Sequence, residues 1–404
     1  MSPPLPGTVA LLEEGIEGGL HPGAQLYVSV AGEPVADLAV GEARPGRPLA
    51  TGDLVVWLSS TKPTAAVALA RLWEAGALEL DDPVARFLPE FAAGGKEGVT
   101  LRHLLTHTGG IRMLDVGWPR EDWDAIIARI ASRKLEPRWV PGHKAGYHLS
   151  SSWFVLGEVV RRIDGRPYER FVREELFGPL GMEDSWVGMP VERYRAYGDR
   201  IVPMYNTEVP PGEDGPPPHR WHREEWVTRP SPGGNGRGPI RELGLFYETL
   251  LAGGVSPRTG NRVLTPQTVE ALTARHRVGL FDHTFRHTMD WGLGFIVNSA
   301  FYDEPDLPYA YGPHASRRTY GHSGYRSSTA FADPEHRLAV ALATNGTPSD
   351  PAHLERMDAL CAAVYRDLGL GGEELLARIE TTRGKARAGA PSAADLIRQD
   401  RDAR

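Results

Sequence analysis

The hydrophobic positions divide the chain into strand-like ends and a helical middle. Residues 24–30 alternate apolar and polar side chains, residues 31–34 form a turn, and residues 35–40 return, which predicts a β-hairpin. Strand patterns come back near the other end, at 294–297, 328–332 and 338–344. We therefore expect one sheet that is built from both ends of the chain.

Helical spacing of apolar residues dominates between these strands. The predicted helices lie at 9–16, 64–75, 153–164, 168–176, 239–251, from 266 onward, and 350–368, and residues 101–110 are expected to form a short helix that runs into a glycine turn. Gly76 and Gly165 follow two of these segments, and glycine is a common helix terminator. The region from 78 to 191 is therefore expected to be mostly helical.

The stretch from 203 to 239 has a different character. It holds the proline-rich run 209–218, which cannot form regular structure, and the glycine-rich run 230–236. Trp221 and Trp226 lie between the two runs. Long irregular segments of this kind are commonly active-site loops, so we expect this one to form a pocket wall.

These patterns predict an α/β (α+β) fold, in which an antiparallel sheet is flanked by helices. Residues 1–76 and 240–371 would form the α/β lobe, and residues 77–239 would form an inserted helical lobe that includes the 203–239 loop. The charged segment 372–404 reads as a C-terminal tail. A cleft between two such lobes is the expected place for a site.

Composition narrows the possible functions. The 404 residues are 41% hydrophobic and carry a net charge of −7, which argues against a nucleic-acid surface. The first residues have no basic region followed by a long apolar core, so we expect neither a secretory signal nor a membrane span. The single cysteine, Cys361, is expected to be buried on the apolar face of a helix. A cytoplasmic protein is the expectation, and the oligomeric state stays open.

The strongest chemical pattern is Ser59-x-x-Lys62 at the start of the alanine-rich helix. Residues three apart on a helix lie on one face, so the two side chains can meet. The chain has five lysines, and only Lys62 has a serine three residues before it. A lysine can act as a base when its pKa is lowered, which arginine cannot do. A purely structural explanation is also open, because serine is a favoured N-cap residue.

Other reaction chemistries find less support. Three histidine pairs, 103/107, 219/222 and 283/287, have helical spacing but lack the glutamate of a metalloprotease helix. The Gly-x-Ser-x-Gly elbow of α/β-hydrolases is absent from the sequence. We expect no catalytic metal and no cofactor.

Four segments together carry a resemblance to a known family. They are Ser59-x-Thr61-Lys62, the Leu-Leu-Thr-His-Thr-Gly-Gly segment at 104–110, Pro141-Gly142 before Tyr147, and Gly321-His322-Ser323-Gly324. In this order they resemble the serine β-lactamase and penicillin-binding protein superfamily, and most closely its class C-like branch with the family VIII carboxylesterases. The resemblance extends over residues 8–370.

The resemblance implies a role for each matching residue. Ser59 would be the acylated nucleophile, Lys62 its base, and Tyr147 would share the proton transfer. His322 would orient Tyr147 through a hydrogen bond or contact the substrate. The backbone N–H groups of Ser59 and Tyr325 would form the oxyanion hole. Further candidates for substrate contact are His148, Ser323, Gly324, Trp221 and Trp226.

Two positions depart from the family pattern. The second motif usually reads Tyr-x-Asn or Tyr-x-Ser, but Leu149 follows Tyr147 here and provides no amide; Ser150, Ser151 or Ser152 could substitute for it. His322 replaces the lysine that typically meets a substrate carboxylate. The first departure leaves the polar role in the second motif unassigned, and the second weakens the case for a β-lactamase or a D-alanyl-D-alanine carboxypeptidase.

The sequence therefore predicts a serine acyl-enzyme catalyst, foremost a carboxylesterase for small acyl esters. The main rival is a transacylase that passes the acyl group to an amine or alcohol. Further rivals are a D-amino-acid peptidase, a β-lactamase, and a non-enzymatic member of the fold. The expected partner is a small acyl substrate, with neither nucleic acid nor membrane involved.

Overall fold

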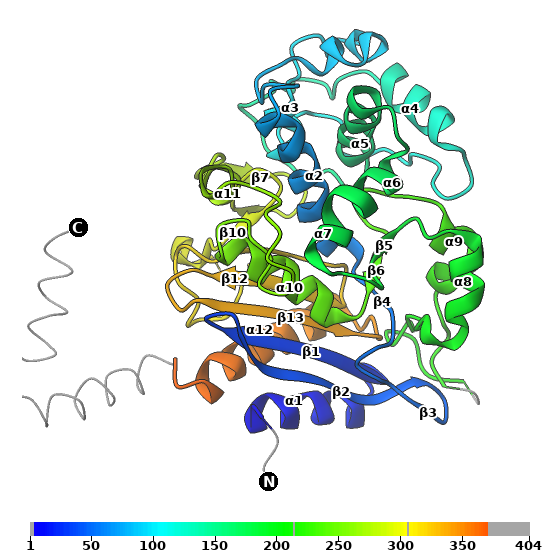
Figure 1. Cartoon of the computed structure of the whole chain (residues 1–404), viewed down its shortest axis with the longest axis vertical. Coiled ribbons are helices and arrows are strands. Elements are labelled where there is room, and N and C mark those ends of the chain that lie inside the picture. Colours follow the sequence, from blue (N-terminus) through cyan, green and yellow to red (C-terminus); the bar gives the residue numbers. More distant parts are fainter. Residues whose placement is uncertain (1–3, 213–214, 305–306, 371–404) are drawn as a thin grey trace, which may run out of the picture.

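The computed structural model describes residues 4–212, 215–304 and 307–370. A large antiparallel sheet lies below a layer of helices in the view of Figure 1. This arrangement confirms the predicted fold class. The predicted tail, 372–404, lies outside the described residues.

The main sheet combines strands from both ends of the chain. Its order is β3-β2-β1-β13-β12-β11-β10-β9, so the first strand, β1, pairs with the last, β13. The strands are β1 (Gly23–Val30), β2 (Glu33–Arg44), β3 (Arg47–Pro48), β9 (Asp290–Trp291), β10 (Ile296–Val297), β11 (Tyr320–Ser323), β12 (Ser328–Asp333) and β13 (Leu338–Thr344). The hairpin pattern at 24–40 and the strand patterns at 328–332 and 338–344 are thus confirmed.

Alternation of side-chain size along the central strands sets the two faces of the sheet. In β13, Ala339, Ala341 and Ala343 belong to the core cluster on one face, whereas Val340 and Leu342 belong to the cluster on the other. Successive residues of a strand point to opposite faces, so this pattern separates small from large side chains. The alanine face leaves room for helix α10 (Ile240–Leu251), which packs directly on β13, β1 and β12.

The opposite face is covered by the two terminal helices. Helices α1 (Pro6–Glu17) and α12 (Asp350–Asp367) contact each other and share a core cluster with the large side chains of the sheet. Cys361 lies in this cluster and is 2% exposed. The N-terminal and C-terminal regions of the described chain therefore both contribute strands and helices to the α/β lobe.

The helical layer lies beyond α10 and is built around α2 (Lys62–Glu74), which packs against α5 (Ser151–Asp164). The remaining helices are α3 (Leu101–Leu105), α4 (Trp123–Ser132), α6 (Tyr168–Val172), α7 (Gly178–Leu180), α8 (Val191–Tyr197), α9 (Glu224–Thr228) and α11 (Pro266–Thr273). None of the described helices is long and apolar enough to cross a membrane.

The 203–239 segment is more regular than its composition suggests. Besides α9, it contains β6 (Gly236–Gly238), which pairs with β4 (Val55–Val56) and β5 (Trp186–Val187) in a small sheet. Glycine is normally rare in strands, so residue propensities do not predict β6. The strand can lie here because its glycines let the backbone approach Trp57 closely. A side chain at 236 or 238 would collide with Trp57.

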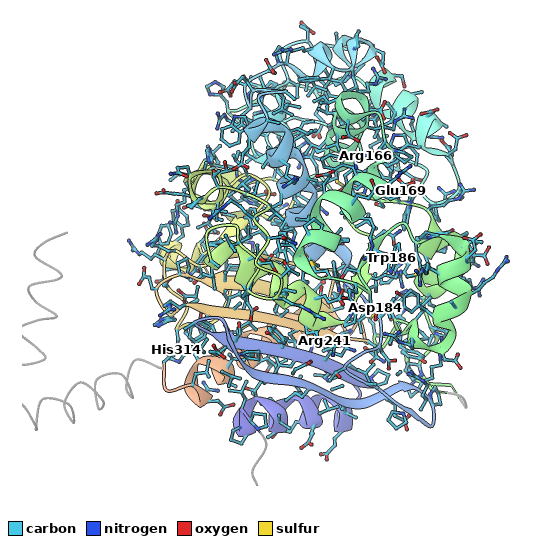
Figure 2. All side chains as sticks on the ribbon, viewed as in Figure 1. Arg166, Glu169, Asp184, Trp186, Arg241 and His314 are labelled. Atoms are coloured by element: carbon cyan, nitrogen blue, oxygen red, sulfur yellow. The ribbon has the colours of Figure 1, made fainter. Side chains whose placement is uncertain are left out.

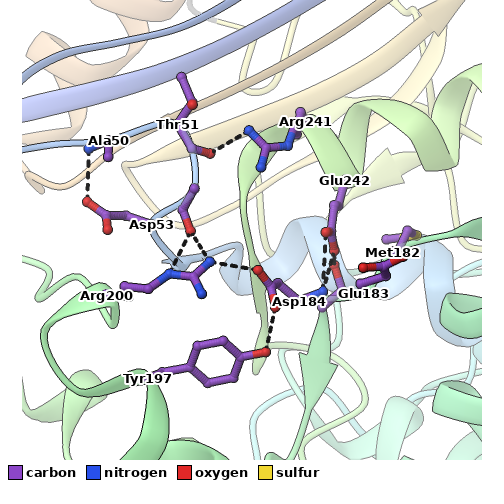
Figure 3. A network of polar contacts seen from close by, with 12 residues as sticks. Ala50, Thr51, Asp53, Met182, Glu183, Asp184, Tyr197, Arg200, Arg241 and Glu242 are labelled. Atoms are coloured by element: carbon purple, nitrogen blue, oxygen red, sulfur yellow. Dashed lines mark hydrogen bonds and ion pairs between the residues drawn. The ribbon is translucent and has the colours of Figure 1, made fainter.

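A polar network joins the small sheet to the α/β lobe (Figure 3). Arg200 donates to the Gly52 carbonyl at 2.6 Å and to Asp184 at 2.6 Å, and Tyr197 donates to Asp184 at 2.7 Å. In Figure 2, Asp184 and Trp186 lie between the helical layer, marked by Arg166 and Glu169, and the sheet near Arg241. The network therefore fixes the segment that leads through β4 to Ser59.

We predict that Cys361 reacts with a thiol reagent only on unfolding. It is buried on α12, and burial raises its pKa to about 12, so thiolate is scarce in the native protein. Titration with a disulfide reagent should give almost no reaction in buffer and one thiol per chain in guanidinium chloride. Rapid reaction of the native protein would contradict the packing of α12.

Candidate active site

Ser59 lies on a single 3₁₀ turn, Leu58–Thr61, that runs directly into α2. Leu58 has a φ of 50°, a left-handed conformation that is unfavourable for a residue with a Cβ. Ser60, which follows Ser59, is fixed by hydrogen bonds to the main sheet. Its hydroxyl donates to the His322 carbonyl at 3.1 Å, and Ser328 donates to the Trp57 carbonyl at 2.7 Å. The turn is thus clamped to β11 and β12 while the Ser59 side chain stays partly exposed.

Lys62 is fully buried beside Ser59. Its Nζ lies 2.8 Å from Ser59 Oγ and donates to the Gly233 carbonyl at 2.7 Å. Burial lowers the pKa of Lys62 well below its ordinary value, because no carboxylate of the described residues pairs with the ammonium form. A neutral amine at this distance can accept the Ser59 proton, so the geometry suits a general base.

Tyr147 lies on the other side of the same hydroxyl. Burial raises the pKa of Tyr147 well above its ordinary value, although a hydrogen bond with Ser59 acts in the opposite direction. Lys62 Nζ lies 5.0 Å from the centre of the Tyr147 ring. Because Lys62 itself is driven toward the neutral form, no nearby cation favours phenolate. Tyr147 is therefore a phenol that can donate a proton to a leaving group.

His322 is buried on β11 and is not open to the 740 Å³ cavity beside Ser59. Its Nδ1 lies 2.8 Å from the Ser323 carbonyl, which makes Nδ1 the protonated nitrogen. Nε2 has no hydrogen-bond partner among the described residues, so the predicted hydrogen bond to Tyr147 is not formed. The ring centres of His322 and Tyr147 are 6.0 Å apart, and burial lowers the pKa of His322 well below its ordinary value. His322 is therefore a neutral side chain that packs near Tyr147.

The proposed oxyanion donors are free. Neither the Ser59 N–H nor the Tyr325 N–H donates to another group within the described part of the chain. Gly324 brings Tyr325 close to the nucleophile, because a Cβ at 324 would lie only 2.5 Å from the Trp57 carbonyl oxygen. Two free amides near a reactive hydroxyl are what an oxyanion requires.

A cavity of about 740 Å³ opens in front of Ser59. Among the predicted substrate contacts, Trp221 lines it and Gly324 does not; Tyr325, predicted only for its backbone N–H, also lines it. Trp226 packs edge-on against Trp118 instead, and Ser323 donates to Thr329 at 2.9 Å on the far side of β11. His148 is buried and accepts the Ile111 N–H at 3.0 Å, so it holds a loop rather than facing the cavity. Of the three serines that could replace the missing amide, only Ser150 lines the cavity.

Three contributors to the site had no sequence prediction. Gly233 supplies the carbonyl that holds Lys62. Asp282, which is buried, accepts the Tyr147 N–H at 3.1 Å and pairs with Arg277 at 3.1 Å. His107 belongs to the 104–110 segment and to a helical pair but had no role assigned from the sequence; it accepts the His148 N–H at 2.9 Å and packs 4.7 Å from the Tyr147 ring. A contact made by a backbone carbonyl, or with a partner more than 100 residues away, leaves no local sequence pattern from which it could be predicted.

Metal binding has no geometric support in the part of the chain that the structure describes. No three His, Cys, Asp or Glu side chains there come close enough together to hold a metal ion. The arrangement of hydroxyl, amine, phenol and two free amides is by contrast complete for nucleophilic acyl transfer.

Comparison with known proteins agrees with this arrangement. A sequence profile of the Beta-lactamase family matches residues 9–363. The chain belongs to this family. It is 31% identical to Esterase EstB of Burkholderia gladioli, over 80% of this chain and 86% of EstB. It is also 31% identical to Penicillin-binding protein 4 of Amycolatopsis lactamdurans, over 80% of this chain and 81% of that protein.

Among solved structures, a family VIII carboxylesterase superposes with a TM-score of 0.72 at 27% identity, over 89% of this chain and 98% of that one. The predicted resemblance is thereby confirmed. The chain is a serine hydrolase of the β-lactamase superfamily.

We predict that Lys62→Met lowers kcat/KM by about 10² or more, because it removes the general base. It should also change the pH dependence of stability. In the native state Lys62 is neutral at pH values where the unfolded chain still binds its proton. The wild type therefore gains stability relative to Lys62→Met as the pH rises toward the unfolded pKa of about 10.4, by up to about 1.4 kcal/mol per pH unit.

Chemical denaturation at pH 7, 8 and 9 measures this difference. Lys144→Met, at a partly exposed lysine, is the matched control and should show no such slope. A difference between wild type and Lys62→Met that stays constant with pH would mean that Lys62 is charged in the folded protein.

Tyr147→Phe should lower kcat by about 10² for esters of alkyl alcohols, because an alkoxide must be protonated as it leaves. The loss should be smaller for p-nitrophenyl esters, since p-nitrophenolate leaves without a proton. Steady-state kinetics with both ester types tests this role. An equal loss for both types would show that Tyr147 only positions Ser59.

Proposed function

We propose that the protein is a carboxylesterase that works through a Ser59 acyl-enzyme. The observation that carries the proposal concerns two basic groups of the described site: Lys62 is driven toward its neutral form, and His322, where the resemblance leads us to expect a lysine, is a neutral imidazole. A carboxylate-bearing β-lactam or peptide would find no partner for its charge there. The 31% identity to an esterase supports the same choice.

The proposed reaction follows from the geometry. Ser59 Oγ attacks the ester carbonyl and passes its proton to Lys62, while the oxyanion accepts hydrogen bonds from the Ser59 and Tyr325 amides. The C–O bond to the alcohol breaks, and the alcohol leaves with the Tyr147 proton. Lys62 then returns its proton to Tyr147. Water attacks the acyl-enzyme by the same steps in reverse order and releases the acid.

A second candidate is acyl transfer to an amine or alcohol. The cavity beside Ser59 is lined largely by apolar side chains, among them Trp118, Phe154 and Trp221, which disfavour water in front of the acyl-enzyme. Measuring acid and amide products with and without an amine acceptor separates the two outcomes. A product that is mostly acid at high amine concentration supports hydrolysis.

We expect a fluorophosphonate probe to form one adduct per chain, seen by intact-mass spectrometry. Ser59→Ala should lose the adduct and all ester turnover, because the nucleophile is gone. Ser150→Ala, at another serine lining the cavity, is the matched control and should keep the adduct. Absence of any adduct on the wild type would indicate a non-enzymatic protein. Faster turnover of nitrocefin or D-amino-acid amides than of esters would favour the β-lactamase or peptidase alternative.

A further inference from the structure

The cavity in front of Ser59 is larger than a short acyl chain needs. Its volume of about 740 Å³ falls in the range of roughly 300–1,000 Å³ that is typical of sites for drug-sized ligands. We propose that it binds a bulky, uncharged, apolar group of the ester substrate. This inference rests on the proposed esterase function and adds the substrate class.

The first support is a set of apolar side chains that nothing in the described structure covers. Met113, Leu149 and Tyr325 are 74%, 64% and 47% exposed, and all three line this one cavity. Single exposed apolar residues are ordinary, but a group of them beside a nucleophile indicates a surface that a ligand covers. The Ser59 hydroxyl in the same wall identifies that ligand as the substrate.

The second support is the charge of the wall. Among the described lining residues only Arg112 and Asp115 are ionic, and each already has a partner. Arg112 makes a two-pronged contact with Glu136, at 2.7 and 3.0 Å, and Asp115 pairs with Arg120 at 3.0 Å. A charged group of a substrate would have to compete with these partners, which favours an uncharged group in the cavity.

The third support is Leu149 itself. It follows Tyr147 by two residues and places its side chain in the cavity, where an asparagine or serine would offer a hydrogen bond. An amide group of a substrate would lose its hydrogen bonds to water here without replacement, which is unfavourable. An apolar group gains from the same contact.

The cavity is also held in shape. The Trp221 carbonyl accepts a hydrogen bond from buried Arg237 at 2.9 Å. The Trp221 ring stacks on the His219 ring, with 4.2 Å between their centres. His219 Nε2 in turn lies 2.9 Å from Thr347 Oγ1. A wall that is fixed before binding does not have to be ordered by the substrate, so apolar contact converts more fully into affinity.

The test uses two series of esters and measures kcat/KM. One series holds p-nitrophenol constant and lengthens the acyl chain from acetate to octanoate. The other holds the acetyl group constant and enlarges the alcohol from ethyl to octyl, so that every leaving group is an alkyl alcohol. We expect at least one series to rise, by about fourfold for each methylene that the cavity buries. The series that rises identifies whether the acid or the alcohol occupies the cavity.

Leu149→Asn tests the wall directly. It should lower the ratio of kcat/KM for the largest to the smallest ester of the rising series by roughly tenfold, because apolar contact is replaced by a polar amide. Val140→Asn is the matched control: Val140 is 53% exposed but does not line the cavity, so the ratio should stay at the wild-type value.

The outcomes separate this inference from the proposed function. Turnover of acetate esters with a flat or falling profile in both series would overturn the inference and leave the esterase function standing. An unchanged ratio in Leu149→Asn would also overturn it. Failure of the wild type to form a fluorophosphonate adduct or to hydrolyse any ester would overturn both.

Discussion

The burial of the Lys62 amine is the constraint on which the rest of the site depends. An ammonium ion in this position would lose its hydration and gain only a hydroxyl and a carbonyl, so the neutral form is favoured. The neutral amine in turn removes the positive charge that would make Tyr147 a phenolate. With His322 also neutral, the resting site holds no net charge around Ser59. In the proposed reaction, charge develops there only when the ester is attacked, beside the two free amides.

This arrangement requires four segments that are distant in the sequence to meet at the site. The Ser59 turn comes from the N-terminal region, Tyr147 from the helical layer, Gly233 from the long loop, and Gly324 from the last hairpin. The alternation of alanine with larger residues in β12 and β13 makes this possible, because it lets α10 lie close to the sheet. The hydroxyls of Ser60 and Ser328 then fix the turn to that sheet, which supports the strained φ of Leu58.

The sequence predicted what local spacing encodes. The Ser59 and Lys62 side chains meet as their three-residue separation indicates, and the strand patterns at both ends of the chain predicted the shared sheet correctly. The oxyanion roles of Ser59 and Tyr325 stay predictions, although their amides are free. By contrast, the placement of Trp226 and His148 outside the cavity depends on tertiary packing that no period reveals. The same holds for Asp282, whose partner Tyr147 lies 135 residues away.

The strand at Gly236–Gly238 shows most clearly where prediction from the sequence fails. Its residues have poor strand propensity, and sequence reasoning assigned them to a loop. The strand forms since Trp57 occupies the space that side chains would need, and its middle residue, Arg237, then reaches the Trp221 carbonyl. A cavity wall is thereby fixed by a residue that does not touch the cavity.

Selectivity in the proposed esterase arises from rejection as much as from attraction. A charged substrate would have to leave its charge without a partner beside apolar side chains such as Leu149, and an unpaired buried charge is costly. An uncharged ester avoids this cost and gains from covering Met113, Leu149 and Tyr325. The chemical steps at Ser59 are the same for both substrates. The neutral surroundings that make Lys62 a base therefore also restrict which carbonyl compounds reach it.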